Sequence, residues 1–301
     1  MLPVSVRRRI GSGRPPGGPI VNRWALLALP ALAFLVVCFI VPLVIIGSRS
    51  VTEFPRGIDG DALTNYARFF AGEANLRVLR NTFLVAGLST IACLLIGYPY
   101  AYLMYLTPPR VAGILLVAVL VPFWSSLLVR TYAWQVLLRD TGVINTTLID
   151  LGVLTEPLKL YQTTTGTLLG MTQILLPFMV LPIYAVMRRI DPEFPKAAAN
   201  LGAPPVAAFV RVFLPLSLPG VISGALIVFV LALGFYITPA LLGSPRDTMI
   251  SAFIATAVQR QLDWGLASAM AGILMVITLS VLLIASRFVH IRDVFGALED
   301  E

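Results

Sequence analysis

The sequence is poor in the groups from which enzyme active sites and metal centres are built. Charged residues make up 12% of its 301 residues, against about 25% in a typical globular protein. The single histidine, His290, cannot form a pair of histidine metal ligands and gives little basis for a Ser/His/Asp triad. Cys38 and Cys93 lie within apolar stretches, where they act as small hydrophobic residues, so we predict neither a disulfide nor a metal site.

A phosphate-binding loop is also missing. The motif G-x-x-x-x-G-K-[ST] does not occur, and no glycine is followed directly by lysine, so the chain has no loop of this type to hold ATP phosphates. We therefore predict a protein that is not an enzyme and binds no cofactor itself. If ATP drives it, the ATPase is another polypeptide.

Long apolar runs dominate the chain instead. Hydrophobic residues make up 58% of the sequence, and the mean hydropathy is +0.88. A helix needs about 20 apolar residues to cross the bilayer core. Six charge-free runs approach or exceed this length: 24–48, 81–109, 111–129, 160–187, 212–245 and 264–286. The sequence therefore predicts an all-α, polytopic membrane helix bundle with six transmembrane helices. The apolar run 249–258 is too short to cross and is expected to form an interfacial or re-entrant helix.

Aspartate and glutamate are absent from all six runs. Ion-coupled carriers and proton pumps normally keep an Asp, Glu or His inside the membrane to hold the coupling ion. A secondary carrier is therefore disfavoured, whereas a channel with a neutral pore stays an alternative.

Basic residues outnumber acidic ones and give a formal net charge of +7. Arginines at positions 7–9 and Arg23 flank the first run, and such charges beside the first span favour a cytoplasmic N-terminus. We expect a disordered, basic cytoplasmic tail over residues 1–23, a transmembrane domain over 24–290 and a cytoplasmic tail over 291–301. Arginines at the inner membrane boundary explain the net charge without a nucleic-acid partner.

The most distinctive segment, about residues 190–218, lies between the fourth and fifth runs. Asp191-Pro192 is a helix-start pattern, and Gly202 is a natural helix C-cap. A helix of one or two turns is therefore predicted over residues 196–201. Pro204-Pro205 forbids any continuation of this helix.

A second short helix is predicted directly after these prolines. Residues 207–213 have an apolar face, and we expect the helix to be closed by Pro215 and by Pro219-Gly220. Two short helices joined by a stiff corner would form a rigid projection that another protein can bind.

This segment resembles the cytoplasmic EAA loop of permease subunits of binding-protein-dependent ATP-binding-cassette (ABC) importers. The resemblance rests on the pair Ala197-Ala198, a glycine four residues later, and the L-P-L and P-G steps before an apolar helix. Residues 122–148, PFWSSLLVRTYAWQVLLRDTGVINTTL, are similar to the matching stretch of the first permease subunit of spermidine/putrescine-type importers. The likeness covers about residues 24–290. One residue departs from the pattern, because Lys196 stands where the family usually has glutamate.

The resemblance implies a type I ABC importer permease in the bacterial inner membrane, with both termini in the cytoplasm. It also implies a second permease subunit, two ATPase subunits that use ATP and Mg, and an extracytoplasmic substrate-binding protein. Polyamines (spermidine or putrescine) are the implied substrates, with opine-like compounds, thiamine and iron as alternatives. The residues implied to couple to the ATPase are Lys196, Ala197, Ala198, Leu201, Gly202, Ala203, Phe209, Pro215, Pro219 and Gly220.

Aromatic residues and one arginine within the runs are candidates for a translocation pathway. Interfacial anchoring is the default for such aromatic side chains, and we expect Arg130 to snorkel to the outer interface beside Tyr132 and Trp134. A ring that faces a pathway would instead attract an ammonium group by about 0.5–2 kcal/mol. The candidate pathway residues are Trp124, Arg130, Tyr132, Trp134 and Tyr236.

Overall fold

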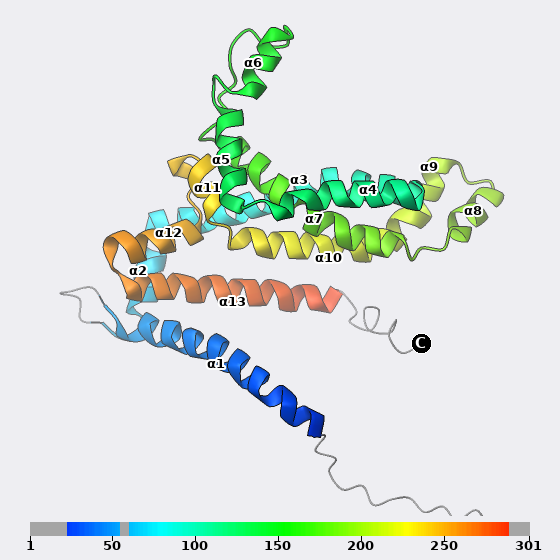
Figure 1. Cartoon of the computed structure of the whole chain (residues 1–301). Helices are drawn as coiled ribbons and strands as arrows, with labels where there is room; N and C mark the ends of the chain where they lie inside the picture. The colour runs from blue at the N-terminus through cyan, green and yellow to red at the C-terminus, as the bar shows by residue number, and fades with distance from the viewer. Residues whose placement is uncertain (1–22, 55–59, 289–301) are drawn as a thin grey trace, which may run out of the picture. The chain divides into compact units, whose positions relative to one another are not determined.

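The computed structural model describes residues 23–54 and 60–288, and these residues form helices joined by turns, with no strand among them (Figure 1). Residues 1–22 and 289–301 lie outside the described residues, so the predictions for the two tails and for His290 cannot be compared with it. The chain divides into two units, residues 1–45 and 46–301, which are described separately.

The described part of the first unit is the larger part of helix α1 (Arg23–Thr52). Its apolar side chains are exposed from Leu29 to Val41, as they are on a helix surrounded by lipid. The helix has the length and hydropathy needed to cross a membrane. It therefore accounts for the first predicted span.

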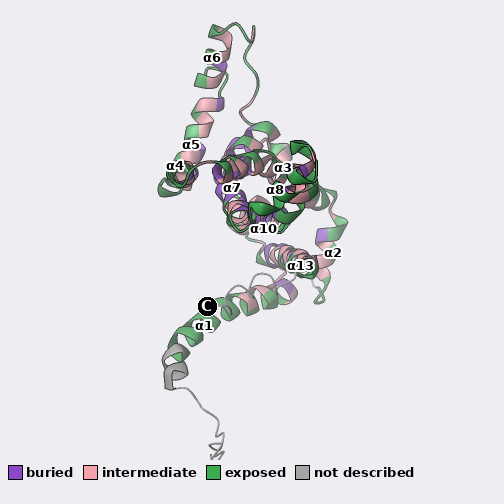
Figure 2. Cartoon of the chain, turned by 90° about the vertical axis from the view of Figure 1, so that its right-hand side faces the viewer, coloured by how far each residue is buried: buried purple, intermediate pink, exposed green. Residues whose placement is uncertain are grey.

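Three long helices form the core of the second unit: α3 (Glu73–Leu106), α7 (Thr164–Met187) and α10 (Leu214–Leu233). Figure 2 shows that buried residues gather where these helices face one another. Gly220 and Gly224, one turn apart on α10, bring its backbone against that of α7. A Cβ atom on Gly220 would lie 2.9 Å from the Pro182 carbonyl oxygen, and one on Gly224 would lie 3.0 Å from that of Met179. Small residues allow this close helix contact.

A smaller apolar cluster joins α13 (Trp264–Phe288) to α2 (Thr64–Ala71), α12 (Ile250–Thr256) and the π-helical turn η4 (Ala257–Gln261). Phe69, Ile250 and Met270 are fully buried in it. The prediction for run 249–258 is consistent with this structure, because α12 has only 7 residues and packs on the bundle.

The third predicted span is broken. In place of one helix over residues 111–129, the chain forms α4 (Pro109–Leu120), the 3₁₀ turn η1 (Val121–Trp124), α5 (Leu127–Leu138) and α6 (Val143–Asp150). The two halves meet at 98°. Pro122 lacks a backbone donor, and Ser125 is extended and donates its hydroxyl to the Pro122 carbonyl oxygen at 2.8 Å. The run 111–129, which the sequence counts as one span, is therefore not one continuous helix, and the chain bends after Pro122.

The fifth predicted span is also interrupted. α10 ends at Leu233, Gly234 leaves the helical conformation, and the short helix α11 (Ile237–Leu242) follows. The 3₁₀ turn η3 (Pro245–Asp247) then leads to α12. The run 212–245 is therefore one long helix followed by a short one.

Five helices of the described chain are long and apolar enough to cross a membrane, and the bent pair 109–124 and 127–150 is a sixth if it counts as one span. The all-α membrane bundle is confirmed on this count. Between α7 and α10 lie α8 (Glu193–Asn200), α9 (Pro205–Ala208) and the π-helical turn η2 (Phe209–Phe213).

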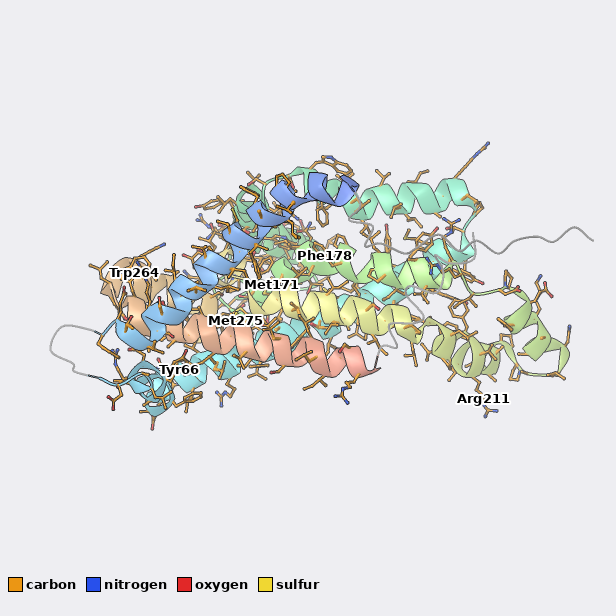
Figure 3. The ribbon with its side chains drawn as sticks, turned by 90° about the horizontal axis from the view of Figure 1, so that it is seen from below. Tyr66, Met171, Phe178, Arg211, Trp264 and Met275 are labelled. Carbon is orange, nitrogen blue, oxygen red and sulfur yellow. The ribbon has the colours of Figure 1, made fainter. Side chains whose placement is uncertain are left out.

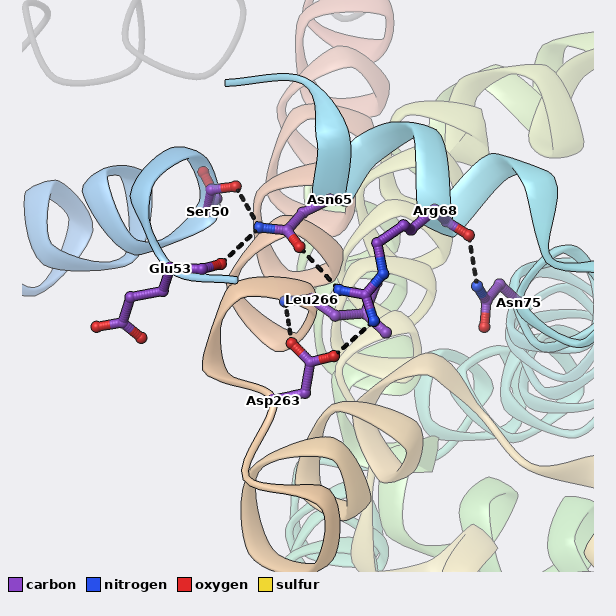
Figure 4. Close-up of polar contacts among 7 residues, drawn as sticks. All are labelled: Ser50, Glu53, Asn65, Arg68, Asn75, Asp263 and Leu266. Atoms are coloured by element: carbon purple, nitrogen blue, oxygen red, sulfur yellow. Dashed lines mark hydrogen bonds and ion pairs between the residues drawn. The ribbon is translucent and has the colours of Figure 1, made fainter. Parts of the chain in front are cut away.

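A polar cluster ties the end of α1 to α2 and to the start of α13 (Figure 4). The buried Asn65 amide donates to the carbonyl oxygens of Ser50 and Glu53, both at 2.9 Å. Its own oxygen accepts from Arg68 at 3.0 Å, and Arg68 also pairs with Asp263 at 2.8 Å. We call Ser50, Glu53, Asn65, Arg68 and Asp263 the Asn65 cluster.

Backbone groups also take part in the contacts of the Asn65 cluster. The Asp263 carboxylate accepts from the backbone N–H of Leu266 at 3.0 Å. Gly265 sits so close to the Glu53 carbonyl oxygen that a Cβ atom there would overlap it. Buried polar groups are stabilising only when they are paired, and here the pairing joins segments 195 residues apart.

Candidate functional site

The helix α8 begins directly after the predicted start pattern Asp191-Pro192. The Asp191 side chain accepts from the Glu193 backbone N–H at 2.9 Å, and this bond satisfies a donor that the first turn of a helix leaves free. The helix covers Glu193–Asn200 and so includes Lys196, Ala197 and Ala198. It starts one turn before the predicted range, since Pro195 is accepted within the first turn of a helix.

Gly202 ends this helix in the left-handed conformation, with φ of +85°. The backbone N–H of Ala203 donates to the Ala198 carbonyl oxygen at 3.0 Å across the turn, the bond expected of a glycine C-cap. The predicted C-cap is confirmed. No atom lies within 4 Å of the position that a Cβ on Gly202 would take, so the glycine is required by backbone conformation and not by crowding.

The second short helix does not end where the sequence predicted. α9, η2 and α10 form one continuous helical segment from Pro205 to Leu233, which includes Pro215, Pro219 and Gly220. Pro215 lies in the first turn of α10, directly after the wide π turn in which Leu214 N–H donates to the Phe209 carbonyl oxygen. The π turn lets the helix continue through Pro215, so Pro215, Pro219 and Gly220 belong to the packed helix and not to a loop.

An aromatic cluster connects this segment to α3. The rings of Phe209 and Phe213 are stacked, with centroids 5.8 Å apart. Tyr102 packs edge-on against both, at 5.1 Å and 5.3 Å, and Tyr105 lies 4.9 Å from Phe213. The Tyr98 hydroxyl is 2.9 Å from that of Ser217. Phe209 therefore packs between η2 and α3, and the coupling role predicted for it from the sequence stays a prediction.

The turn between α8 and α9 is apolar and exposed. Leu201 is 89% exposed and Val206 is 75% exposed, and Phe194 on α8 is also exposed. Figure 3 shows the Arg211 side chain, on the following turn, far from Tyr66 and Trp264 at the other end of the bundle. Exposed apolar side chains grouped on a projecting segment are typical of a protein-binding surface. We call residues 193–206 the coupling segment, after the role that the sequence predicts for residues within it.

Lys196 forms a local ion pair. Its ammonium group lies 2.9 Å from the Glu193 carboxylate, and both side chains are largely exposed, at 66% and 72%. The hydrogen bond to Glu193 raises the pKa of Lys196 above its ordinary value. Lys196 is therefore charged at neutral pH and neutralised by its own helix.

The candidate pathway residues are only partly brought together. Trp124 is 79% exposed on η1, and Tyr132 on α5 and Tyr236 after α10 are also exposed. Trp134 on α5 points to α7, where its ring nitrogen donates to the Gln173 side chain at 3.4 Å. The buried Nε atom of Arg130 has no hydrogen-bond partner among the described residues. Snorkelling of Arg130 stays a prediction.

Two glutamines near this site were missed by the sequence reasoning. Gln135 donates to the Leu241 carbonyl oxygen at 3.0 Å and to the Tyr161 hydroxyl at 3.2 Å. Gln173 accepts from Trp134. The signal that could have found them is an amide side chain within an apolar stretch, because an amide buried in a membrane bundle needs hydrogen-bond partners. These contacts join α5, α7 and α11.

No group of three or more His, Cys, Asp and Glu side chains that could hold a metal ion occurs within residues 23–54 and 60–288. The site consists of a projecting apolar segment and a helix core, which suits binding and movement more than bond chemistry.

Comparisons with known proteins agree with this geometry. Residues 24–295 match the family described as "Binding-protein-dependent transport system inner membrane component". The spermidine/putrescine transport system permease protein PotB of Haemophilus influenzae is 36% identical over 76% of this chain and 78% of that protein. PotB of Escherichia coli K12 is 33% identical over 75% of this chain and 82% of that protein.

A similar fold occurs among solved structures. A chain of the bacterial alginate ABC transporter, crystallised with its alginate-pentasaccharide-bound periplasmic protein, superposes with a TM-score of 0.68. It covers 90% of this chain and 96% of that chain at 19% identity. At this identity the likeness concerns the fold alone.

Proposed function

Since the chain belongs to the family of binding-protein-dependent transport system inner membrane components, we propose that it is the permease subunit of an ATP-driven polyamine importer. The substrate class rests on the PotB relatives, which are named for spermidine and putrescine transport and share 32–36% identity with this chain. The chain itself is a transport subunit and not an enzyme.

The observation that carries the coupling role is the exposure of the coupling segment. Leu201, on the turn after α8, and Val206, in α9, present apolar surface to the surroundings. A separate ATPase subunit, which binds ATP and Mg, would cover this surface. Two such subunits, a second permease and an extracytoplasmic binding protein complete the proposed complex.

The aromatic cluster then provides the route by which movement reaches the membrane helices. α9, η2 and α10 are continuous, so a displacement of the coupling segment moves the N-terminal end of α10. Phe209 and Phe213 pack on Tyr102 and Tyr105 of α3, and aromatic contacts of this kind resist separation. α3 and α10 would therefore move together, as interfaces in transporters do when one helix group rocks against another.

The proposed orientation places both termini and the coupling segment in the cytoplasm. The support is the cluster of arginines before the first span and the pair Arg188-Arg189 at the end of α7. An ATPase that uses cytoplasmic ATP can reach the coupling segment only in this orientation.

The substitution Gly202→Val tests the proposed function. A β-branched residue at φ of +85° costs more than about 1 kcal/mol locally, but its side chain meets no neighbour. We expect normal membrane insertion, loss of the ATPase on co-purification, and uptake of labelled spermidine or putrescine reduced at least about tenfold.

Gly152→Val is the matched control. Gly152 also has a positive φ, +71°, and also has free space around it, but it follows α6 and lies outside the coupling segment. The Gly152→Val variant should have the same local backbone strain as Gly202→Val and should still co-purify with the ATPase. Normal uptake and ATPase retention in Gly202→Val would remove the docking assignment.

A further inference from the structure

A cavity of about 320 Å³ opens between α3, α4 and α7. Its lining includes Tyr105, Pro109, Ala112, Gly113, Tyr184 and Arg188. The Tyr100 hydroxyl donates to the Leu115 carbonyl oxygen at 2.7 Å, and this bond holds α4 against α3. The coupling role proposed above makes no use of this cavity.

The cavity lies at the level where apolar helices end. α3 ends at Leu106, α7 ends at Met187, and α4 begins at Pro109. The ends of membrane-spanning helices mark the boundary between the hydrocarbon core and the lipid headgroups. One part of the cavity therefore faces headgroups, while its continuation along α4 faces acyl chains.

The polar part of the cavity is positively charged. The Arg188 guanidinium carbon lies 6.0 Å from the centre of the Tyr184 ring, and none of the ion pairs among the described residues involves Arg188. Asp191 caps α8 by accepting from the Glu193 backbone N–H and does not line the cavity. Among the described residues that line it, Arg188 is the one charged side chain, so the cavity favours an anion over a polyamine.

The apolar part of the cavity has room for a hydrocarbon chain. No atom lies within 4 Å of the position of a Cβ on Gly113, and Leu116 lies one turn further along α4 in the same lining. Beyond them, Ile114 and Val117 are exposed on the surface of α4. An apolar path therefore runs from Arg188 along the helix.

We propose that this cavity binds one anionic phospholipid, with its phosphate against Arg188 and an acyl chain along Gly113 and Leu116. Basic pockets between membrane helices at the headgroup level bind acidic lipids, and arginine is suited to phosphate because its N–H groups match two oxygens. The tyrosines supply the aromatic surface that is favourable at this depth.

Native mass spectrometry of the assembled importer in mild detergent, with added phosphatidylglycerol or phosphatidylcholine, tests the proposal. The wild-type complex should retain one phosphatidylglycerol and not phosphatidylcholine. Arg188→Gln removes the charge and should weaken retention about tenfold. A Cβ on Gly113 would meet no atom within 4 Å, so Gly113→Leu should occupy the cavity and abolish retention while the complex stays assembled.

Two variants serve as matched controls. Arg189→Gln removes the neighbouring charge, which does not line the cavity, and Gly87→Leu adds the same side chain to α3 where nothing lies within 4 Å. Both should retain the lipid. Equal retention in all variants, or equal binding of phosphatidylcholine, would overturn the proposal. Displacement of the lipid by inorganic phosphate alone would instead assign the site to a free anion, and a cross-link from Gly113→Cys to a partner chain would assign it to a subunit interface.

Discussion

At one end of the second unit, the Asn65 cluster joins three helices through paired and largely buried polar groups. At the other end, the coupling segment has one exposed ion pair and a turn whose apolar side chains have no cover. The first arrangement fixes the helix ends relative to one another. The second leaves an exposed apolar surface, which we propose binds a separate ATPase subunit. One end of the unit is therefore held together by its own polar contacts, and the other end is free to bind.

Gly265→Val should have the largest effect on this contrast. The added side chain would overlap the Glu53 carbonyl oxygen, so the end of α1 and the start of α13 could not approach. We expect a loss of more than about 3 kcal/mol in unfolding free energy, seen as little folded protein in membranes. Gly47→Val, which meets nothing within 4 Å, should accumulate normally. Equal amounts of both variants would show that the contact at Gly265 is not needed.

Arg68→Ala should come next. It removes the partner of Asp263 and one donor to Asn65, and the Arg68 side chain is 29% exposed. An unpaired carboxylate in such a place costs about 2 kcal/mol, less than in a fully buried pair. Thermal unfolding in detergent measures this loss of stability. Arg68→Lys keeps the charge and should lose less, whereas a loss as large as that of alanine would assign the effect to the shape of the guanidinium.

Leu201→Asp should affect binding and leave folding unchanged. Leu201 is 89% exposed, so the change in unfolding free energy should stay within about 0.5 kcal/mol. Burial of a new charge at an interface should weaken ATPase binding by about 2 kcal/mol, or about 30-fold. Co-purification at graded ATPase concentrations measures the affinity. Leu151, directly after α6, is 71% exposed, and Leu151→Asp should retain normal affinity. Loss of affinity in both variants would count against ATPase binding at the coupling segment.

Lys196→Ala should have the smallest effect. The pair with Glu193 is exposed to solvent, and such pairs contribute little. The pKa of Lys196 is raised, so the contribution of the pair is present below the ordinary lysine pKa and is lost only as pH rises through the raised value. Unfolding of Lys196→Ala and wild type should therefore coincide at neutral pH. A clear difference there would mean that Lys196 has a partner beyond Glu193.

The sequence predicted best where one local pattern decides the structure. The cap of α8 at Asp191 and the left-handed turn at Gly202 follow from side-chain chemistry within a few residues. The six apolar runs likewise indicated the membrane bundle, because length and the absence of charge are enough.

The sequence predictions failed where packing against neighbouring helices or turn geometry decides whether a helix continues past a proline. Pro215 and Pro219 were predicted to stop a helix, but the π turn before them and the contact of Gly220 with α7 allow α10 to continue. The run 111–129 was counted as one span, but the chain bends by 98° between residues 109–124 and 127–150. The Asn65 cluster could not be predicted, because its members are brought together only by the packing of α1, α2 and α13.

The π turn η2 also determines how changes in chain length would act. A π turn holds one residue more than the α-helical path between the same ends, so deletion of one residue from Phe209–Phe213 would let the segment relax into an ordinary α-helix. Each residue of an α-helix corresponds to a rotation of about 100°. Because the π turn and the α-helical path join the same ends, such a deletion would leave the coupling segment facing nearly the same way around the axis of α10, whereas deletion of one residue from the regular part of α10 would turn it by about 100°.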